Sequence, residues 1–396
     1  MTQKPYLLYV ITEDWSLFTH RIDLARRAQK AGFRVGIACS VHKHAEQIEA
    51  ENFDLYPLKH LKRGSLNPFQ DLLAFWEILC LYRKVRPDLV HHVALKPVLY
   101  GSLAARFTKI SGIVNALGGL GYLFIGTSFK VKTIRFFLLN LLKLVFQRKN
   151  LALILQNPED RAVFKNIITP QQVYLVRGSG VDLKVFYPLK SGISSEQKKS
   201  TDITDIKVIF CGRLLWDKGV GELMAAARLL KEKKNALRIQ IVGNTDPKNP
   251  SSISESLLKS WKNEDVVDFL GSRKDIPDLL RLSDIAVLPS YREGLPKALL
   301  EAAATGLPLV ATDVPGCREI VQDGVNGFFV PPKNAQKLAN ALEILAADRH
   351  LRERMGKESH KRVEMYFSEE KINTEILEIY QKVSTVSLLS NASCKA

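Results

Sequence analysis

Short apolar runs alternate with longer amphipathic stretches along almost the whole chain. In the first half, amphipathic stretches at 19–32, 67–85 and 97–107 separate apolar runs that read YLLYVIT, RVGIACS, DLVHHV, GIVNAL, LALILQ and VYLVRG. Apolar and β-branched runs of this length are typical of buried strands, and the stretches between them are typical of helices. The alternation therefore predicts βαβ units around a parallel sheet.

One polar stretch interrupts this alternation, PLKSGISSEQKKSTDITDI at 188–206. The pattern then restarts with KVIFCGR, RIQIVG, VVDFLG, IAVLPS, LPLVATD and GFFV. We therefore predict an α/β protein with two Rossmann-like domains that face each other across a cleft, where a ligand binds. The predicted parts are a first domain at 1–187, a linker at 188–206, a second domain at 207–365, and a C-terminal helix and tail at 366–396 that pack back towards the first domain.

Length and composition agree with this picture. The 396 residues are 46% hydrophobic and 25% charged, which is typical of globular domains with sizeable cores. Of the net charge of +16, residues 1–180 carry +13, because they hold 25 Lys and Arg against 12 Asp and Glu. The first domain is therefore expected to attract an anionic partner.

The cysteines and the N-terminal residues indicate in which cellular compartment the protein works. Five scattered cysteines without a C-x-x-C pair argue against zinc and against a disulfide framework, and fit a reducing cytoplasm. The apolar run Tyr6 to Ile11 is followed at once by acids, so it indicates a buried strand and not a signal peptide. No apolar segment approaches the roughly 20 residues needed to span a bilayer.

The segment SYREGLPKALLEAAATGLPLVAT, residues 290–312, carries candidate chemistry. Pro296 suits the start of a helix and Gly306 its end, which predicts a helix from Pro296 to about Thr305. The free N–H groups at its start would bind phosphate. Glu293 would then lie beside the group beyond the phosphates, and Glu301 could accept hydrogen bonds from a ribose diol.

A structural interpretation of the two acids stays open. Glu293 could be a helix-start charge and Glu301 a solvated helix residue. The apolar neighbours of Glu301 argue against the second point, because an unpaired carboxylate among them would be costly. In KVIFCGRLLWDKGV, Arg213 and Lys218 follow a strand and could neutralise a leaving diphosphate, although a lone Arg at a strand end is more often solvated.

Several of these pieces together resemble glycosyltransferase family 4, retaining enzymes of the GT-B fold. The pieces are GRLLWDKG, IVG, FLGSRKDIPDLL, DIAVLPSYREGLPKALLEAAATGLPLVATDVPGCREIV and DGVNGFFVPP, and the spacing of Glu293 and Glu301 is the family's E-x7-E. The resemblance implies that Arg213, Lys218 and Glu293 are catalytic. The donor-binding residues that it implies are Gly212, Gly243, Arg273, Gly294, Leu295, Pro296 and Glu301.

The resemblance also implies front-face attack, with the departing diphosphate as the base and no enzyme nucleophile. The sequence contains no Asp-x-Asp, the pattern by which metal-dependent sugar transferases hold a divalent ion. We therefore expect neither a metal nor a cofactor.

The acceptor is expected to lie against the first domain, because loops at strand carboxyl ends face the cleft. Candidates for this side are Asp14, Trp15, His20, Lys96, Asn115 and Gly118. Trp15 could instead cap the sheet, and strand alternation predicts that one of His91 and His92 points into packing and the other outward. The chain departs from many family members in having no His after GIVNAL, where it reads NALGGLGY.

Segments of the first domain, among them DWSLFTHRIDLA and HHVALKPVLYGSLAAR, resemble the subgroup that builds bacterial capsule, O-antigen and lipid-linked oligosaccharides. That subgroup implies a nucleotide-sugar donor, UDP-hexose or UDP-N-acetylhexosamine, and a polyprenyl-diphosphate-linked glycan as acceptor. A nucleotide-sugar 2-epimerase of the same architecture is the alternative.

Residues 128–149, SFKVKTIRFFLLNLLKLVFQRK, place ten aliphatic and aromatic side chains from Ile134 to Phe146, with basic residues around them: Lys130, Lys132, Arg135, Lys143, Arg148 and Lys149. This mixture suits a helix that lies in the headgroup layer of an anionic membrane. A core-packed helix with solvated ends is the alternative. We predict a cytoplasmic enzyme peripherally attached to the inner face of the membrane, and no nucleic-acid partner, because no helix-turn-helix, RNP or finger pattern occurs.

Overall fold

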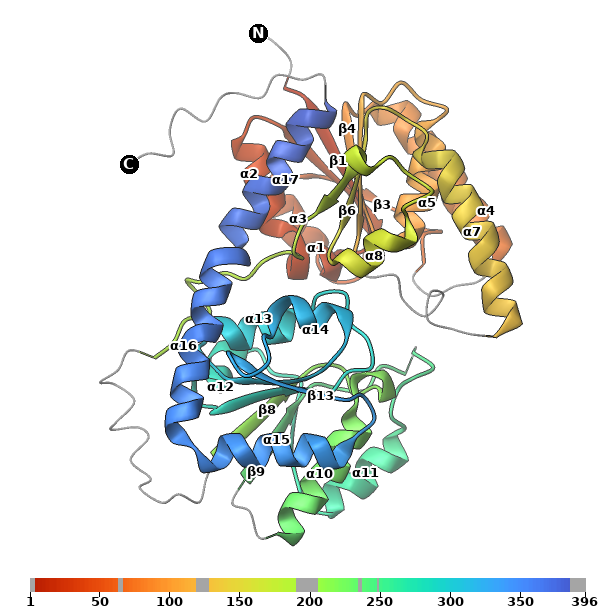
Figure 1. The fold of residues 1–396 in the computed structure, drawn as a ribbon. Helices are drawn as coiled ribbons and strands as arrows, with labels where there is room; N and C mark the ends of the chain where they lie inside the picture. Colours follow the sequence, from red (N-terminus) through yellow and green to blue (C-terminus); the bar gives the residue numbers. More distant parts are fainter. Residues whose placement is uncertain are drawn as a thin grey trace, which may run out of the picture. The chain divides into compact units, whose positions relative to one another are not determined.

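The computed structural model describes residues 4–62, 67–118, 128–189, 206–233, 237–247 and 249–384. The chain divides into two compact units, Met1–Ser179 with Ile372–Ala396, and Gly180–Lys371 (Figure 1). Most of the predicted linker, residues 190–205, and the tail beyond residue 384 lie outside the described residues.

In the first unit the described residues form a seven-stranded parallel sheet in the order β3-β2-β1-β4-β5-β6-β7. The strands are β1 (Tyr6–Glu13), β2 (Arg34–Ser40), β3 (Asp54–Pro57), β4 (Leu89–Val93), β5 (Gly112–Leu117), β6 (Leu151–Leu155) and β7 (Val173–Leu175). The helices are α1 (Asp14–His20), α2 (Ile22–Lys30), α3 (Ala45–Ala50), α4 (Pro68–Val85), α5 (Leu95–Ala105), α7 (Phe129–Phe146), α8 (Pro158–Val163) and a 3₁₀ turn, η1 (Pro170–Gln172).

Helices cover both faces of this sheet. Along β1, Leu8 and Val10 pack into a core with α4, α5 and α7, whereas Leu7, Tyr9 and Ile11 pack into a core with α2 and the end of the chain. A strand with both faces covered is apolar throughout instead of alternating, as β1 is.

This double cover corrects the expectation for the two histidines of β4. His91 and His92 do point to opposite faces, but both are fully buried, because neither face of the sheet is open to solvent. Burial lowers the pKa of both imidazoles, that of His92 to about 4.

Three local features differ from the prediction in the first unit. The stretch 19–32 is not one helix, because the chain breaks at Arg21, whose backbone leaves helical geometry and whose side chain is buried. Helix α1 also starts directly at Asp14, so Asp14 and Trp15 are helical and do not lie in a loop. The edge strand β3 was missed, since its four residues are too few to show a pattern.

In the second unit the described residues form a six-stranded parallel sheet in the order β10-β9-β8-β11-β12-β13. The strands are β8 (Ile206–Cys211), β9 (Leu237–Val242), β10 (Asp268–Gly271), β11 (Ile285–Leu288), β12 (Leu309–Thr312) and β13 (Gly327–Val330). The helices are a 3₁₀ turn η2 (Trp216–Lys218), α10 (Val220–Glu232), α11 (Glu255–Asn263), α12 (Ile276–Arg281), α13 (Lys297–Ala304), α14 (Pro315–Ile320), α15 (Ala335–Ala347) and α16 (Arg349–Tyr366).

The last helix of the described residues is α17 (Glu369–Val383), and most of it belongs to the first unit. Ile372, Ile376 and Tyr380 lie on one side of α17 and are fully buried in the core that contains Tyr9. The hydroxyls of Tyr9 and Tyr380 are 3.0 Å apart. Two Rossmann-like units, each with a parallel sheet, confirm the predicted α/β fold class.

Candidate active site

The sheet order of the second unit brings two loops together. From β8 the chain continues to β9 and β10 on one side of β8, and then returns to place β11 on its other side. Loops that leave the carboxyl ends of two such strands diverge and leave a crevice, which is where ligands bind in doubly wound sheets. The loops after β8 and β11 carry Arg213, Lys218 and Glu293.

Gly219 sets the distance between these two loops. It has a φ of +71°, and a Cβ at this position would lie 2.1 Å from the carbonyl oxygen of Pro289, just after β11. The Tyr291 N–H also donates to the carbonyl of Asp217 at 2.8 Å. Only glycine permits both the backbone angle and the approach, so Lys218 is held beside the second loop.

Lys218 and Glu293 form an ion pair. Lys218 Nζ lies 2.5 Å from Glu293 Oε1, and the two side chains are only 24% and 10% exposed. Cys317 is buried close by, and burial together with the Glu293 carboxylate raises the pKa of its thiol well above the ordinary value. The structure thus brings together two of the three residues predicted to be catalytic, with opposite charges neutralised against each other.

The backbone at Glu293 and Gly294 is fixed by the start of α14. Gly316 N–H donates to the carbonyl of Glu293 at 3.2 Å. A Cβ on Gly316 would lie 2.4 Å from the carbonyl oxygen of Gly294 and 2.7 Å from that of Glu293. Any larger residue at 316 must therefore push this loop away.

We expect Gly316→Ala to lower the activity of the site about tenfold, since a shift on the order of 1 Å of Glu293 suffices for such losses. Initial rates are compared with those of Gly324→Ala, a control for general destabilisation: its φ of +73° strains an alanine, but its Cβ meets no atom within 4 Å. Equal rates for the two variants would contradict a positioning role for Gly316.

Helix α13 begins at Lys297, one residue later than predicted, with Pro296 as its N-cap, and ends before Gly306, whose φ is +79°. Glu301 lies in its middle with its side chain 17% exposed, and Lys297 Nζ is 3.9 Å from the carboxylate. Burial raises the pKa of Glu301 to about 7, and the Lys297 charge offsets this only in part. The carboxylate of Glu301 is therefore not left without a cation, but Lys297 lies at the outer limit of an ion pair.

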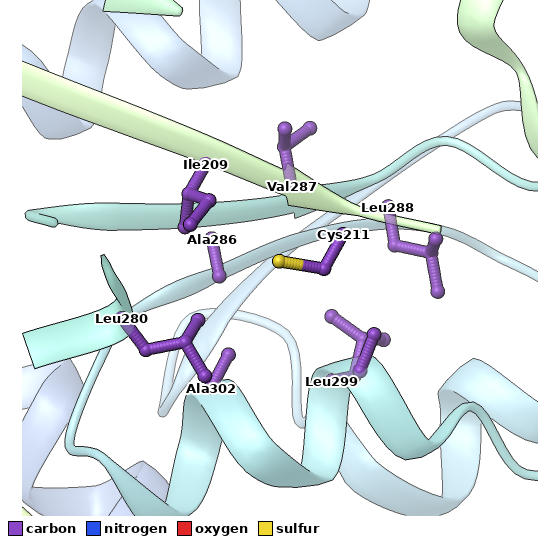
Figure 2. A pocket seen from close by; sticks show the side chains of 9 residues that line it. Ile209, Cys211, Leu280, Ala286, Val287, Leu288, Leu299 and Ala302 are labelled. Carbon is purple, nitrogen blue, oxygen red and sulfur yellow. The ribbon is translucent and has the colours of Figure 1, made fainter. Parts of the chain in front are cut away.

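Between α13 and strands β8 and β11 lies a small apolar cavity of about 10 Å³ (Figure 2). The sulfur of Cys211 points into it, opposite Leu299 and Ala302 of α13. Burial and the nearby Glu301 carboxylate raise the pKa of the Cys211 thiol to about 12. A cavity of this size holds one water molecule at most, so it is a packing gap and not a ligand site.

The other predicted residues of the second unit lie at the same edge of the sheet. Arg213 Nη1 donates to Asp246 Oδ2 at 2.7 Å. Gly243 has a φ of +140°, and its Cβ would lie 1.8 Å from the Gly212 carbonyl oxygen, so these two glycines allow neighbouring strand ends to touch. Arg273 is exposed and pairs with Asp275.

Sequence reasoning missed a second pair beside Glu293. The Tyr291 hydroxyl donates to Glu222 Oε1 of α10 at 2.7 Å, and Lys333 Nζ lies 5.1 Å from the centroid of the Tyr291 ring. Neither Glu222 nor Lys333 carries a sequence signal, because both are far from position 291 in the chain. The only sequence clue to this pair was that Tyr291 lies in the segment 290–312, which carries Glu293 and Glu301.

In the first unit, Asp14 is completely buried. One carboxylate oxygen accepts hydrogen bonds from the N–H groups of His42, Lys43 and His44, and the other accepts from Trp15 N–H. Burial alone would raise the pKa of Asp14, but these four donors outweigh it and lower the pKa to about 2. Asp14 therefore holds the turn after β2 against α1.

Asn115 is also buried, within a polar network on one face of the sheet. Its Oδ1 is 2.6 Å from His92 Nδ1 and accepts from Ser102, and His92 Nε2 is 2.7 Å from the Tyr82 hydroxyl. Gly118 follows at the end of β5, where a Cβ would meet only an ordinary contact with Gln156. Residues 119–127, which include the rest of the glycine run, lie outside the described residues.

The remaining residues predicted on the acceptor side are partly accessible. Lys96 pairs with Asp71 at 2.6 Å. Trp15 is 37% exposed, and its indole N–H donates to Glu13. His20 ends α1 half-buried, and its carbonyl accepts from Arg21.

Residues 129–146 form helix α7, as predicted. One side packs into the core through Val131, Leu142 and Val145. The other side exposes polar Lys132, Asn140, Lys143 and Gln147 and also large apolar side chains, Phe129, Ile134, Phe136, Phe137 and Leu144. The helix is thus core-packed along one side and apolar at its surface along another.

Within the ranges that the structure describes, no helix is both long and apolar enough to cross a membrane. The same ranges hold no group of three or more His, Cys, Asp and Glu side chains arranged to bind a metal ion.

Comparison with known proteins extends over most of the chain. Residues 193–362 match the family described as glycosyl transferases group 1, and residues 6–157 match the family described as glycosyl transferase 4-like. The N,N'-diacetylbacillosaminyl-diphospho-undecaprenol alpha-1,3-N-acetylgalactosaminyltransferase of Campylobacter jejuni is 34% identical over 81% of this chain and 84% of its own.

A second relative is the UDP-Gal:alpha-D-GlcNAc-diphosphoundecaprenol alpha-1,3-galactosyltransferase of Escherichia coli, 26% identical over 72% of this chain and 73% of its own. Among solved structures, HepE of Anabaena in complex with UDP superposes with a TM-score of 0.76 at 19% identity, over 95% of this chain and 100% of that one. At this identity the likeness establishes a shared fold.

Proposed function

The chain belongs to the glycosyl transferases of group 1, and from this premise we propose that it moves a sugar from a UDP-sugar to a glycan carried on polyprenyl diphosphate. We further propose that the transfer retains the anomeric configuration and serves surface polysaccharide biosynthesis. Support for the acceptor comes from the names of the Campylobacter and Escherichia relatives, both of which act on diphospho-undecaprenol-linked sugars. The Escherichia relative also names a UDP donor.

The observation that carries the proposal is the Lys218–Glu293 pair between the loops that follow the neighbouring strands β8 and β11. A diphosphate beside Lys218 would compete with Glu293 for the ammonium, which then stabilises the charge of the departing UDP. Arg213, at the end of the same strand, would supply the second cation by leaving Asp246. These two cations would do the work of a divalent ion, so the proposal includes neither metal nor cofactor.

Helix α13 would hold the rest of the donor. The backbone from Gly294 to Pro296 leads into its N-terminus, where N–H groups and the helix dipole favour phosphate. Glu293, released from Lys218, would face the transferred sugar. Glu301 would accept hydrogen bonds from the ribose hydroxyls. These close donors would replace the distant Lys297 as partners of the carboxylate.

The acceptor is carried by a lipid, so we propose that the enzyme works while attached to the inner face of the membrane. The exposed aromatic residues of α7, with Lys132 and Lys143 between them, support attachment through residues 128–149. The four described cysteines are all free thiols, in keeping with a reducing cytoplasm. The 2-epimerase alternative is not carried forward, because both matched families are transferases.

A transfer assay with purified protein tests the proposal. Labelled UDP-hexoses and UDP-N-acetylhexosamines are supplied with polyprenyl-diphosphate-linked mono- and disaccharides, and label is counted in the organic phase. We expect organic-phase label with at least one donor and acceptor pair, and unchanged rates in the presence of EDTA. If no pair transfers label, the substrate class is wrong, and if EDTA abolishes transfer, the proposed role of Arg213 and Lys218 fails.

A further inference from the structure

Helix α4 of the first unit has an unusual surface. Phe69, Leu72, Leu73 and Trp76 are 79%, 54%, 49% and 50% exposed. They lie at positions i, i+3, i+4 and i+7 and therefore form one continuous stripe, about 10 Å long, on the outer side of the helix. Exposed Arg83 and Lys84 continue this side of the helix towards its C-terminus.

The inner side of α4 is equally apolar. Ala74, Ile78, Leu79 and Tyr82 are buried in the core under the sheet. A helix on the surface of a globular protein normally presents polar residues opposite its buried stripe. Helix α4 instead presents large apolar residues to solvent, and exposed apolar patches of this kind mark surfaces that contact another molecule or a membrane.

Contacts at the end of α5 connect α4 with α7. At the end of α5, the exposed Phe107 packs edge-on against Phe75 of α4, with ring centroids 6.3 Å apart. The neighbouring Arg106 donates to the carbonyl of Leu144 in α7 at 2.7 Å. Figure 1 shows α4, α5 and α7 on the same side of the sheet. We call the exposed apolar residues of these three segments the α4–α7 surface.

The exposed charges on and beside α4 and α7 are basic. The two acids of α4 are occupied: Asp71 pairs with Lys96, and Glu77 accepts from the N–H groups of Lys59 and His60. The exposed charged residues around the surface are Arg83, Lys84, Lys132, Lys143 and Lys149. Aromatic and aliphatic side chains ringed by cations complement an anionic lipid surface, in which acyl chains lie beneath phosphate headgroups.

We propose that α4 is a second membrane-contacting helix, which inserts Phe69, Leu72, Leu73 and Trp76 into the outer acyl region of an anionic membrane. The inference rests on the proposed attachment through residues 128–149 and extends it to a two-helix surface. Attachment is then carried by apolar insertion as well as by charge, so it persists at salt concentrations that screen charge alone.

Trp76 provides a direct measurement. The protein is mixed with phosphatidylglycerol and phosphatidylcholine vesicles that carry bromine on the acyl chains near the headgroup. We expect the bromines to quench part of the tryptophan fluorescence, and expect Trp76→Phe to bind equally well but to lose that quenched part. The other tryptophans, Trp15, Trp216 and Trp261, are the same in both proteins.

Vesicle sedimentation separates the contributions of the two helices. Leu72→Glu with Leu73→Glu should weaken binding roughly tenfold or more. Lys132→Glu, Lys143→Glu and Lys149→Glu together test α7, and Lys259→Glu, Lys262→Glu and Lys337→Glu, on the second unit, are the matched charge control. All of these side chains are exposed, so unchanged thermal unfolding is expected and is measured for each variant.

The outcomes distinguish this inference from the proposed function. If the protein sediments with vesicles but Trp76 is not quenched and the leucine variant binds normally, α7 attaches alone and the inference is overturned. If the wild type does not bind anionic vesicles, the attachment through 128–149 fails as well, while the transfer assay still decides the chemistry. If sedimentation velocity shows a dimer that the leucine variant dissociates, the surface belongs to a second copy, and the inference is wrong.

Discussion

Replacing Lys218 with alanine is expected to lower sugar transfer by about 10² to 10³-fold at saturating donor, because one preorganised charge that stabilises the leaving diphosphate is removed. The loss should fall mainly on kcat, since the diphosphate carries more charge as the bond to the sugar breaks. Initial rates with a labelled donor measure it. Lys218→Arg, which keeps the charge, should retain more activity than the alanine variant.

The matched control is Lys337→Ala, which removes an exposed ammonium of the same unit. Lys218→Ala also leaves the Glu293 carboxylate without its cation, which costs about 1–3 kcal/mol of stability. The double variant Lys218→Ala, Glu293→Gln should regain the lost stability, as measured by thermal unfolding. Its rate of sugar transfer should stay low. If Lys218→Ala transfers sugar as fast as the control, the assignment of the diphosphate to this pair is wrong.

Replacing Glu301 with glutamine is expected to stabilise the protein above pH 7 and to weaken nucleotide binding at the same time. The folded pKa of about 7, against 4.5 for an unperturbed glutamate, means that ionisation disfavours the folded state. The loss of folding stability caused by this ionisation is absent below pH 4.5 and grows as the pH rises to 7. Above pH 7 it amounts to about 3 kcal/mol. Glutamine cannot ionise, so Glu301→Gln avoids the penalty.

Unfolding by denaturant at pH 5 and at pH 8 tests this expectation. The variant should gain stability over the wild type at pH 8 and gain little at pH 5. UDP binding should weaken about tenfold, because a neutral amide replaces a charged acceptor for the ribose. Glu232→Gln, on an exposed helix end, is the control and should change neither quantity. Equal gains at both pH values would mean that Glu301 is already ionised at low pH.

The strands other than β3, and the helix at Lys297–Ala304, were predictable because their signals are local. Apolar runs and the glycine at 306 act within a few residues of where they stand. The break at Arg21 was not predictable, because it depends on a guanidinium buried in a core that the sequence does not show. The family resemblance placed Glu293 and Lys218 in one site, but the direct ion pair between them was not predicted.

Residues predicted on the acceptor side illustrate the limit more sharply. Asp14 and Asn115 look like exposed polar groups at strand ends, yet both are buried and hold loops or helices through several hydrogen bonds. Their partners, at 42–44 and at Ser102, are separated from them by many residues. A sequence shows that a polar residue stands near a strand end, but the residues that pack over it decide whether it meets a ligand.

The position of α17 has a consequence for biosynthesis. The first unit takes its final helix from Ile372 onward, whereas the second unit is continuous from Gly180 to Lys371. A nascent chain leaves the ribosome from its N-terminus, so the later-made unit can finish folding before the earlier-made one has its last helix. Until then the apolar residues of the first unit that α17 covers stay open to water, and a messenger truncated near codon 370 would leave them so permanently.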